Sequence, residues 1–380
     1  MTIVSSQPYF SQGIIKGRNP QKLNALMSKA RKMQAQGLPY IHSLHHLALL
    51  TNTTVDYLNT IVCRAYDDYT SYRIQKRSGG SRFINAPSDE LKLLQRWINN
   101  NILYNVPSHW CCFSYHKNAS IIDCAQRHCQ SKWLIKLDIE NFFDTINEVQ
   151  VYETFHSLGY KPMIAFFLAR ICTYEPNWIS TEKKYWVSYN TNSDELPYSK
   201  KNIKYFGRVP QGAPTSPIIS NMVMFSLDDE ISNLIQNKGG IYTRYSDDIF
   251  VSFSQPNFNR NDVSKVIGKI FQKSKRYGYK INKTKIKVLP PGSKKIILGL
   301  NVNQRKPELT KEFKNRIESH LYGMSKFGIS NHAQHRKFDS IFSMIEHIKG
   351  LINYARQISP KYGTSKYTEL SDILMKEGLS

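Results

Sequence analysis

The sequence has few acidic residues for its length and no long apolar segment. It contains 29 Asp and Glu against 52 Lys and Arg, so its formal net charge is +23 at pH 7. So large a positive excess predicts attraction to polyanions, with nucleic acid first and an anionic membrane surface second. No run of 18 apolar residues, secretory leader or lipidation motif is recognisable, which disfavours a membrane partner. We therefore expect a cytoplasmic protein that binds nucleic acid.

The six cysteines include no C-x-x-C pair. In the cytoplasm these thiols are expected to be reduced. By residue type, Cys124, His128 and Cys129, with His116 nearby, suggest zinc, but their spacing fits no structural zinc pattern well. We favour small packed thiols over a metal site.

The apolar residues are numerous enough for a large core. They make up 41% of the 380 residues, and we expect several subdomains around one cleft. Residues 1–40 carry six basic residues and no acid; they include a predicted helix and either contact RNA or form a solvated arm. Residues 261–300 carry eleven basic residues and one acid, which predicts contacts with RNA phosphates. Residues 174–208 are polar and resemble an insertion with little core of its own.

Two short strand-like runs at residues 71–87 flank a Ser-Gly-Gly tip, which predicts a β-hairpin. Lys76, Arg77 and Arg82 crowd its arms. A basic tip suits a triphosphate or a nucleic-acid backbone, and an ordinary charged turn is the simpler alternative. The next segment, DELKLLQRWINNNILYNV, has the apolar spacing of an amphipathic helix. From residue 310 onward, apolar residues again recur at helical spacing.

Carboxylates occur at the ends of apolar, β-prone runs. Asp138 closes WLIKLDI, and Asp247 and Asp248 lie in a Tyr-Ser-Asp-Asp turn between two such runs, IYTRY and IFVSF. Strands are adjacent in a sheet at about 4.8 Å, so these side chains can converge. Three carboxylates together repel one another unless cations are present. Magnesium takes oxygen ligands and shares them with phosphates, and two such ions suit the joining of a nucleotide to a 3′-hydroxyl.

An isolated Asp-Asp pair is more often a solvated turn, because turns favour Asp. Here the pair has a Tyr two residues before it, an Asp at the end of an earlier strand, and the segment PQGAPTSP between them. The order and spacing of all three features favour the catalytic interpretation.

These segments resemble the reverse transcriptase family, and within it the bacterial retron enzymes. The basic hairpin and its helix resemble the fingers motif, LDIENFFDTI the first palm motif, and PQGAPTSP the second. The Tyr-Ser-Asp-Asp turn matches the family's YxDD turn, INKTKIKV a later motif, and IILGLNV the primer-grip hairpin. IKGLINYARQISP resembles the end of the thumb helix in retron and group II intron enzymes. The likeness covers most of the chain, from the hairpin to the last of these motifs.

The resemblance implies roles for individual residues. Asp138, Asp247 and Asp248 would be catalytic and would hold two Mg²⁺ ions together with the Ile139 carbonyl, with Mn²⁺ as an alternative. Phe143 falls at the steric-gate position, where a ring excludes a ribose 2′-hydroxyl, although it is otherwise a core phenylalanine. The remaining implied residues are a nucleotide-binding set (Lys76, Arg77, Arg82, Phe143, Gln211, Gly212), a general acid (Lys285, otherwise a solvated lysine) and a primer grip (Leu298, Gly299).

Membership of the retron group would imply partners as well. Such enzymes bind a structured non-coding RNA encoded beside them, use dNTPs, and prime from a guanosine 2′-hydroxyl in that RNA. Their product is a branched RNA-linked DNA (msDNA), and an effector protein commonly completes an anti-phage system. Two departures are noted: Cys124 replaces the usual Asn of an Asn-Ala-x-x-His motif, and Ile297-Leu298-Gly299 replaces Val-Thr-Gly. A divergent retron enzyme, another prokaryotic defence-associated enzyme or a group II intron-derived enzyme fits both.

The expected architecture is α+β, a right hand with an antiparallel palm sheet and a helical thumb. We expect an N-terminal basic, helical region at 1–70, fingers at 71–130, a palm at 131–304 with the insertion at 174–208, and a thumb at 305–380. A non-catalytic RNA-binding scaffold is the alternative from another class. It predicts loss of a catalytic acid, and none is lost.

Overall fold

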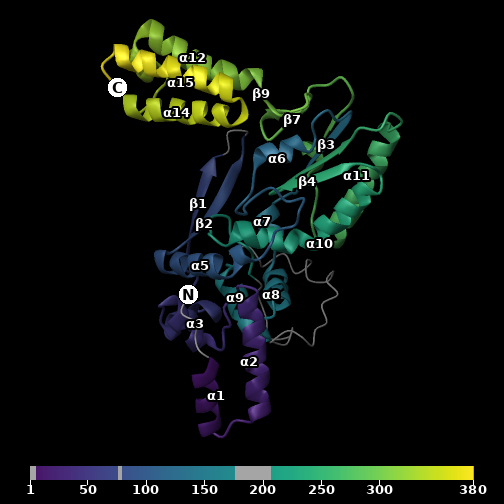
Figure 1. Cartoon of the computed structure of the whole chain (residues 1–380), viewed down its shortest axis with the longest axis vertical. Coiled ribbons are helices and arrows are strands. Elements are labelled where there is room, and N and C mark those ends of the chain that lie inside the picture. The colour runs from purple at the N-terminus through teal and green to yellow at the C-terminus, as the bar shows by residue number, and fades with distance from the viewer. Residues whose placement is uncertain (1–5, 76–78, 176–206, 380) are drawn as a thin grey trace.

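The computed structural model describes residues 6–75, 79–175 and 207–379 of the chain. Figure 1 shows the last helices at one end of the molecule, the first helices at the other, and the largest sheet between them. The predicted α+β class with an antiparallel central sheet is confirmed. Within the described ranges, none of the helices combines the length and the hydropathy that crossing a bilayer requires.

The N-terminal helices begin where the sequence supplies capping side chains. Asn19, Ser43 and Thr54 each accept a hydrogen bond from a backbone N–H of the first helical turn, which satisfies donors that lack a partner within the helix. Apolar residues from Met33 to Val62 join the main core of the molecule. The helices of this region are α1 (Ser6–Ile15), α2 (Pro20–Ala35), α3 (Leu44–Thr51) and α4 (Val55–Val62).

The predicted hairpin and the amphipathic helix after it are both present. Arg82 is exposed on the second strand of the hairpin, whereas Lys76 and Arg77 lie outside the described residues. The predicted insertion at 174–208 lies largely outside them as well; Tyr174 and Arg208, at its two ends, pair through two backbone hydrogen bonds. The elements of the hairpin region are β1 (Tyr69–Gln75), β2 (Ser81–Pro87), α5 (Asp89–Asn101), η1 (Leu103–Asn105) and α6 (Ile121–Gln126).

The central sheet has four strands in the order β4-β5-β3-β6, and every neighbouring pair is antiparallel. Its strands are β3 (Trp133–Asp138), β4 (Ile241–Tyr245), β5 (Asp248–Phe253) and β6 (Lys287–Leu289). The helices around it are α7 (Phe142–Thr145), α8 (Glu148–Ser157), α9 (Pro162–Ile171), α10 (Ser216–Gln236), α11 (Arg260–Arg276) and η5 (Lys283–Lys285).

The two faces of this sheet belong to different cores. Ile135 and Val251 face the main core, which includes residues of α8, α10 and α11. Leu134 and Phe250 face the other side, where they pack with α6 and with strands from residues 296–301. Side chains alternate along a strand, so Asp138 shares the face of Leu134, and Asp248 shares the face of Phe250. The carboxylates therefore project from the face opposite helices α8, α10 and α11.

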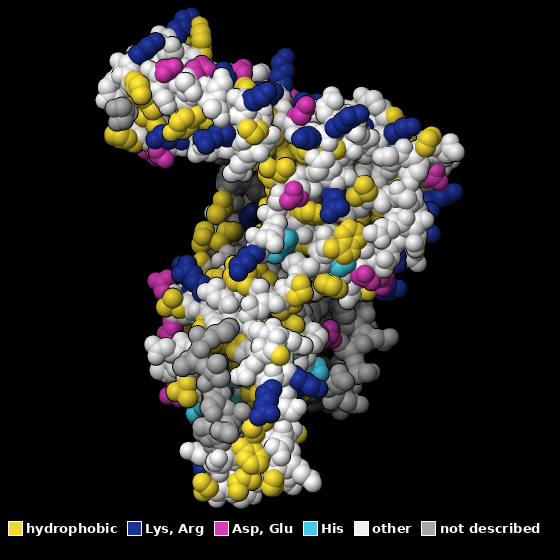
Figure 2. Space-filling model, in the orientation of Figure 1, with side chains coloured by type: hydrophobic (Ala, Val, Ile, Leu, Met, Phe, Trp, Pro, Cys, Tyr) yellow, Lys and Arg dark blue, Asp and Glu magenta, His cyan; other side chains and the backbone are white. Residues whose placement is uncertain are grey.

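The C-terminal helices have a core of their own, centred on Ile317, Leu321 and Ile348, in agreement with the apolar stripes of the sequence. Figure 2 shows the molecule hollowed between these helices and the hairpin side, with Lys and Arg side chains on the helical rim. The elements here are β7 (Ile296–Ile297), β8 (Leu300–Asn301), β9 (Glu308–Leu309), α12 (Lys311–Phe327), α13 (Ile329–His335), α14 (Ile341–Ile358) and α15 (Pro360–Lys376).

Candidate active site

Two of the three carboxylates predicted to converge lie directly opposite each other in the sheet. Asp138 ends β3, Asp248 begins β5, and the two residues are partners in the antiparallel register. Side chains of such partners share a face, with Cβ atoms about 4.5–5.5 Å apart. The neighbouring backbone is held on both sides, because Ile139 N donates to Asp247 O and Asn282 N donates to Asp138 O. Residues distant in sequence thus meet at one edge.

The turn that presents Asp247 and Asp248 is fastened at Ser246. Ser246 has φ +58°, a left-handed conformation that costs free energy outside glycine. The Arg244 guanidinium donates to the Ser246 carbonyl over 3.0 Å, and the Ser246 backbone N–H donates to Ser114 Oγ over 2.9 Å. The Tyr115 hydroxyl donates to Ser246 Oγ over 2.9 Å. The serine side chain therefore makes a contact that alanine at this position would lack.

The site is rich in negative charge. Burial, followed by the charges of Asp247 and Asp138, raises the pKa of Asp248 to about 6. The Lys285 ammonium donates to Asp138 Oδ2 over 2.8 Å, and this hydrogen bond raises the pKa of Lys285. The Lys285 side chain is 58% exposed, so solvent screens much of its charge. The charges of Lys136 and Lys285 both act to lower the pKa of Asp248, yet the net shift is upward, so these two cations only partly balance the repulsion among the three carboxylates.

The donor set fits a hard divalent cation. Asp138, Asp247 and Asp248 supply carboxylate oxygens, and the Ile139 carbonyl accepts no backbone hydrogen bond among the described residues. Oxygen ligands of this kind are those that Mg²⁺ prefers. A bound cation would also relieve the repulsion that raises the pKa of Asp248.

A buried ion pair stands behind the turn. Arg244 and Asp228 are both fully buried, with Nη2 and Oδ2 2.7 Å apart, and the Tyr242 hydroxyl also donates to Asp228 over 2.6 Å. His109 and Cys111 lie close enough to Asp228 to suggest a metal site. However, Arg244 already balances the Asp228 charge, and burial raises the pKa of the Cys111 thiol, which keeps it protonated and a poor ligand. We interpret this cluster as a support for the turn.

The predicted PQGAPTSP segment joins the hairpin to the site. Asn85 N on β2 donates to Gln211 O over 2.7 Å. Gly212 has φ +120°, and a Cβ there would lie 2.8 Å from Ile84 Cγ2. Glycine is therefore required both by the backbone conformation and by the close approach of β2. The place of Gly212 in the nucleotide-binding set, which the resemblance implies, stays a prediction.

The steric-gate and primer-grip candidates occupy defined positions. Phe143 lies on α7, partly buried, with its ring centroid 5.4 Å from that of Phe142. Leu298 and Gly299 form the two-residue turn between β7 and β8, with φ +48° and +83°. Positive φ at both positions is the pattern of a type I′ hairpin turn. The expected hairpin is present, and the functional roles of these residues stay predictions.

The residues that suggested zinc are engaged in hydrogen bonds. Cys124 Sγ lies 3.3 Å from Thr243 Oγ1. His128 uses both ring nitrogens with hydroxyls of the neighbouring strands, and burial lowers its pKa to about 3. His116 Nε2 contacts a backbone carbonyl over 2.9 Å, and Cys129 Sγ lies 3.8 Å from another. We therefore interpret these four residues as packed side chains.

Sequence reasoning missed the residues that hold the catalytic turn, namely Arg244, Asp228, Ser114 and Tyr115. One signal was available, because an arginine inside the β-prone run IYTRY is costly to bury unless an acid meets it. Ser114 and Tyr115 carry no such signal, since their sequence neighbourhood is an ordinary polar loop.

Carboxylates at the ends of antiparallel strands, beside a basic hairpin and a helical domain, define the palm of a right-hand nucleic-acid polymerase. Residues 74–313 match the family described as reverse transcriptase (RNA-dependent DNA polymerase). The chain is 28% identical to the Retron Ec86 reverse transcriptase of Escherichia coli over 91% of this chain and 94% of that protein. It is 30% identical to the Retron Ec73 reverse transcriptase of Escherichia coli over 83% of this chain and 90% of that protein.

The chain therefore belongs to the reverse transcriptase family, and it is an RNA-directed DNA polymerase of the retron type. Among solved structures, telomerase from Candida albicans in complex with a TWJ fragment of telomeric RNA aligns with a TM-score of 0.42 and 13% identity, over 82% of this chain and 64% of that one. This likeness is too low to carry an argument, and the assignment rests on the family match and the palm geometry.

Proposed function

We propose that this enzyme copies part of a cognate structured non-coding RNA into single-stranded DNA that stays joined to the RNA (msDNA). We further propose that it acts in anti-phage defence with an effector protein encoded nearby. The pairing of Asp138 with Asp248 supports the catalytic part of this proposal. The net charge of +23 suits a polyanionic template. Similarity to retron enzymes over most of the chain supports a structured RNA as that template.

Asp138, Asp247 and Asp248 would hold two Mg²⁺ ions together with the Ile139 carbonyl, and Mn²⁺ would be a substitute. Bound there, the ions would activate the attacking hydroxyl and stabilise the leaving pyrophosphate. The hydrogen bonds to Ser246 hold the turn that carries Asp247 and Asp248. A site held in this way is preorganised and needs no rearrangement during the reaction.

Other side chains would place the dNTP and the primer. Arg82, with Lys76 and Arg77, would contact the triphosphate, Gln211 and Gly212 would line the nucleotide pocket, and Phe143 would exclude a 2′-hydroxyl. Leu298 and Gly299 would hold the primer end. These roles correspond to fingers at 71–130, a palm at 131–304 with an insertion at 174–208, and a thumb at 305–380, preceded by the basic, helical region at 1–70.

Lys285 is the proposed proton donor to pyrophosphate. Its hydrogen bond to Asp138 raises its pKa and so keeps the amine protonated. The ammonium has three N–H groups, so one could remain on Asp138 while another donates to the leaving group.

The catalytic part is tested by primer extension on an RNA template with Asp247→Asn and Asp248→Asn. Both variants should lose DNA synthesis and keep RNA binding, because the change removes charge and preserves side-chain volume. Asp372→Asn, an exposed position on α15, is the matched control and should retain full synthesis. Normal synthesis by both active-site variants would overturn the assignment of these residues.

The branched product is tested on nucleic acid that copurifies with the full chain. RNA covalently joined to DNA should appear as a species whose size falls after treatment with either ribonuclease or deoxyribonuclease. DNA free of RNA would instead favour a group II intron-derived or another defence-associated enzyme. The defence role predicts that phage plate less efficiently on cells that carry the complete operon than on cells that carry its Asp247→Asn form.

A further inference from the structure

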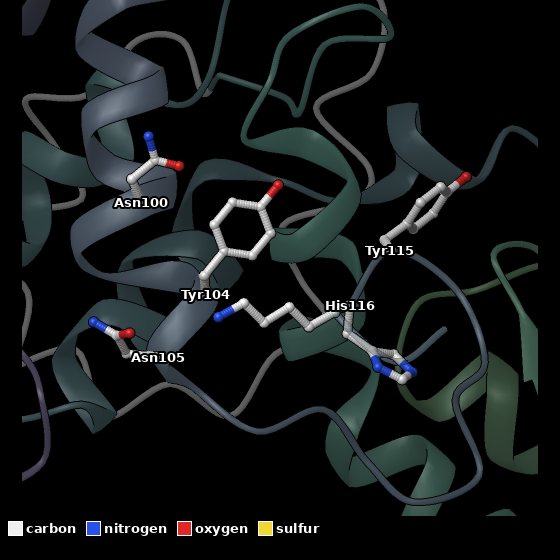
Figure 3. A pocket seen from close by; sticks show the side chains of 6 residues that line it. Asn100, Tyr104, Asn105, Tyr115 and His116 are labelled. Carbon is white, nitrogen blue, oxygen red and sulfur yellow. The ribbon is translucent and has the colours of Figure 1, made fainter. Parts of the chain in front are cut away.

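A second surface beside the catalytic turn has the composition of a nucleotide site. A cavity of about 590 Å³ opens between the C-terminal end of α5 with η1 and the loop at residues 115–117 (Figure 3). The lining offers two amides, two phenols, an imidazole and an ammonium, from Asn100, Tyr104, Asn105, Tyr115, His116 and Lys117. Aromatic, amide and cationic groups together are what a base and its phosphate require.

We propose that this cavity binds one unpaired nucleotide of a nucleic-acid strand, with the base against the Tyr104 ring and the phosphate beside Lys117. The proposal rests on the polymerase function proposed above, for which it adds a contact with the RNA template or with the DNA product. Both sources share the same chemistry, and the experiment below separates them.

The lining side chains differ in what they have left to offer a ligand. Tyr104 is 49% exposed as a residue, so its ring is available for a base to stack on. The side chains of Asn100 and Lys117 form no hydrogen bond or ion pair with any described residue, which leaves an amide for a base edge and a cation for phosphate. Asn105 already donates to the Gly37 carbonyl over 2.6 Å, so it serves as part of the wall.

The cavity suits a strand better than a free small molecule. Asn100, Tyr104, Asn105 and Lys117 are all exposed, so the cavity is open along one side. Sites for free small molecules usually enclose most of the ligand surface. An open site lets the neighbouring nucleotides of a strand enter and leave.

Tyr115 connects this cavity with the catalytic turn. It has φ +64°, a conformation that is uncommon for a tyrosine and that clusters at functional sites. Tyr115 is one of the residues that line the cavity, and its hydroxyl donates to Ser246 Oγ. A nucleotide in the cavity would therefore lie one side chain away from the turn that carries Asp247 and Asp248.

Photocrosslinking of the full chain tests the location directly. A single-stranded RNA containing 4-thiouridine and a DNA of matching sequence containing 4-thiothymidine are irradiated with the protein, and the crosslinked peptides are mapped by mass spectrometry. Crosslinks in the peptides that contain Tyr104 or residues 115–117 are expected, with the RNA arm or the DNA arm identifying the source. Crosslinks confined to other peptides in both arms would overturn the proposal.

Binding measurements on variants provide the second test. Tyr104→Ala and Lys117→Ala should each raise the Kd of the crosslinking strand by about tenfold, since one stacked base or one phosphate contact is lost, whereas Tyr104→Phe should retain most of the affinity. Tyr66→Ala, another exposed tyrosine, is the control. Wild-type affinity in both alanine variants would overturn the nucleotide site. If wild-type protein still extends a primer on RNA, the polymerase function survives that result; if it does not, the polymerase function fails independently.

Discussion

The Tyr115 hydroxyl donates a hydrogen bond to Ser246 Oγ over 2.9 Å, so a residue of the loop before α6 holds the middle of the catalytic turn. Burial raises the pKa of Tyr115, which keeps the phenol protonated and able to donate at neutral pH. Ser246 is in a left-handed conformation, and such a conformation persists only where the surroundings hold it. The contact therefore acts on Asp247 and Asp248 through the turn that carries them.

Tyr115→Phe should lower kcat for nucleotide addition by about two- to tenfold, as expected for the loss of one hydrogen bond of about 0.5–1.5 kcal/mol. The KM for dNTP should change less, because the ring and the nucleotide pocket remain. Ser246→Ala removes the same bond from the other side. Steady-state primer extension should therefore find the double variant no slower than the slower single one; multiplied effects would show that the two residues act separately.

Arg244→Ala should destabilise the protein by about 3–5 kcal/mol, because it leaves the buried Asp228 carboxylate without its partner. Urea unfolding measures this loss. The paired replacement Arg244→Met with Asp228→Leu should recover much of the stability, since it removes both charges together. Synthesis should stay low in the paired variant, because the Ser246 carbonyl still lacks its donor; recovery of full activity would show that the ion pair serves folding alone.

Phe143→Val should let the enzyme incorporate ribonucleotides. A smaller side chain leaves room for a 2′-hydroxyl, and the preference for dNTP over rNTP should fall by at least about tenfold. Single-nucleotide incorporation with each substrate gives the ratio of kcat/KM values. Phe342→Ala, an exposed phenylalanine on α14, should leave that ratio unchanged. An unchanged ratio for Phe143→Val would assign this ring to packing.

The thumb should lose stability in acid. His320 Nδ1 lies 3.1 Å from His332 Nε2, and burial, followed by the charge of Arg336, lowers the pKa of His320 to about 4. An unfolded histidine titrates near 6.5. Between these values the unfolded state binds more protons, so this contribution to stability is complete above about pH 6.5 and declines as the pH falls toward about 4.

Thermal unfolding followed at pH 7.5 and pH 5 checks this expectation. The midpoint should be lower at pH 5, and His320→Gln should show a smaller difference between the two conditions, because the replacement does not titrate. If the unfolding midpoint falls equally between pH 7.5 and pH 5 in His320→Gln and in wild type, the loss of stability arises from other residues.

The sequence by itself determined the local elements of the site. The Ser-Gly-Gly tip predicts the β1–β2 hairpin, and the apolar run that closes at Asp138 predicts a strand with an acid at its end. The Tyr-Ser-Asp-Asp segment between two β-prone runs predicts the turn. Each of these features depends on residues that are neighbours along the chain, so propensity and patterning are sufficient to reveal it.

Only the tertiary structure decided which strands pair and what stands behind the catalytic turn. The register that sets Asp138 opposite Asp248 depends on β3 lying between β5 and β6, an order that no local pattern specifies. Ser114 and Tyr115 reach Ser246 only after the loop before α6 and the central sheet have packed together. Contacts of this kind bring distant segments together through burial of the shared core, and local patterning carries no information about them.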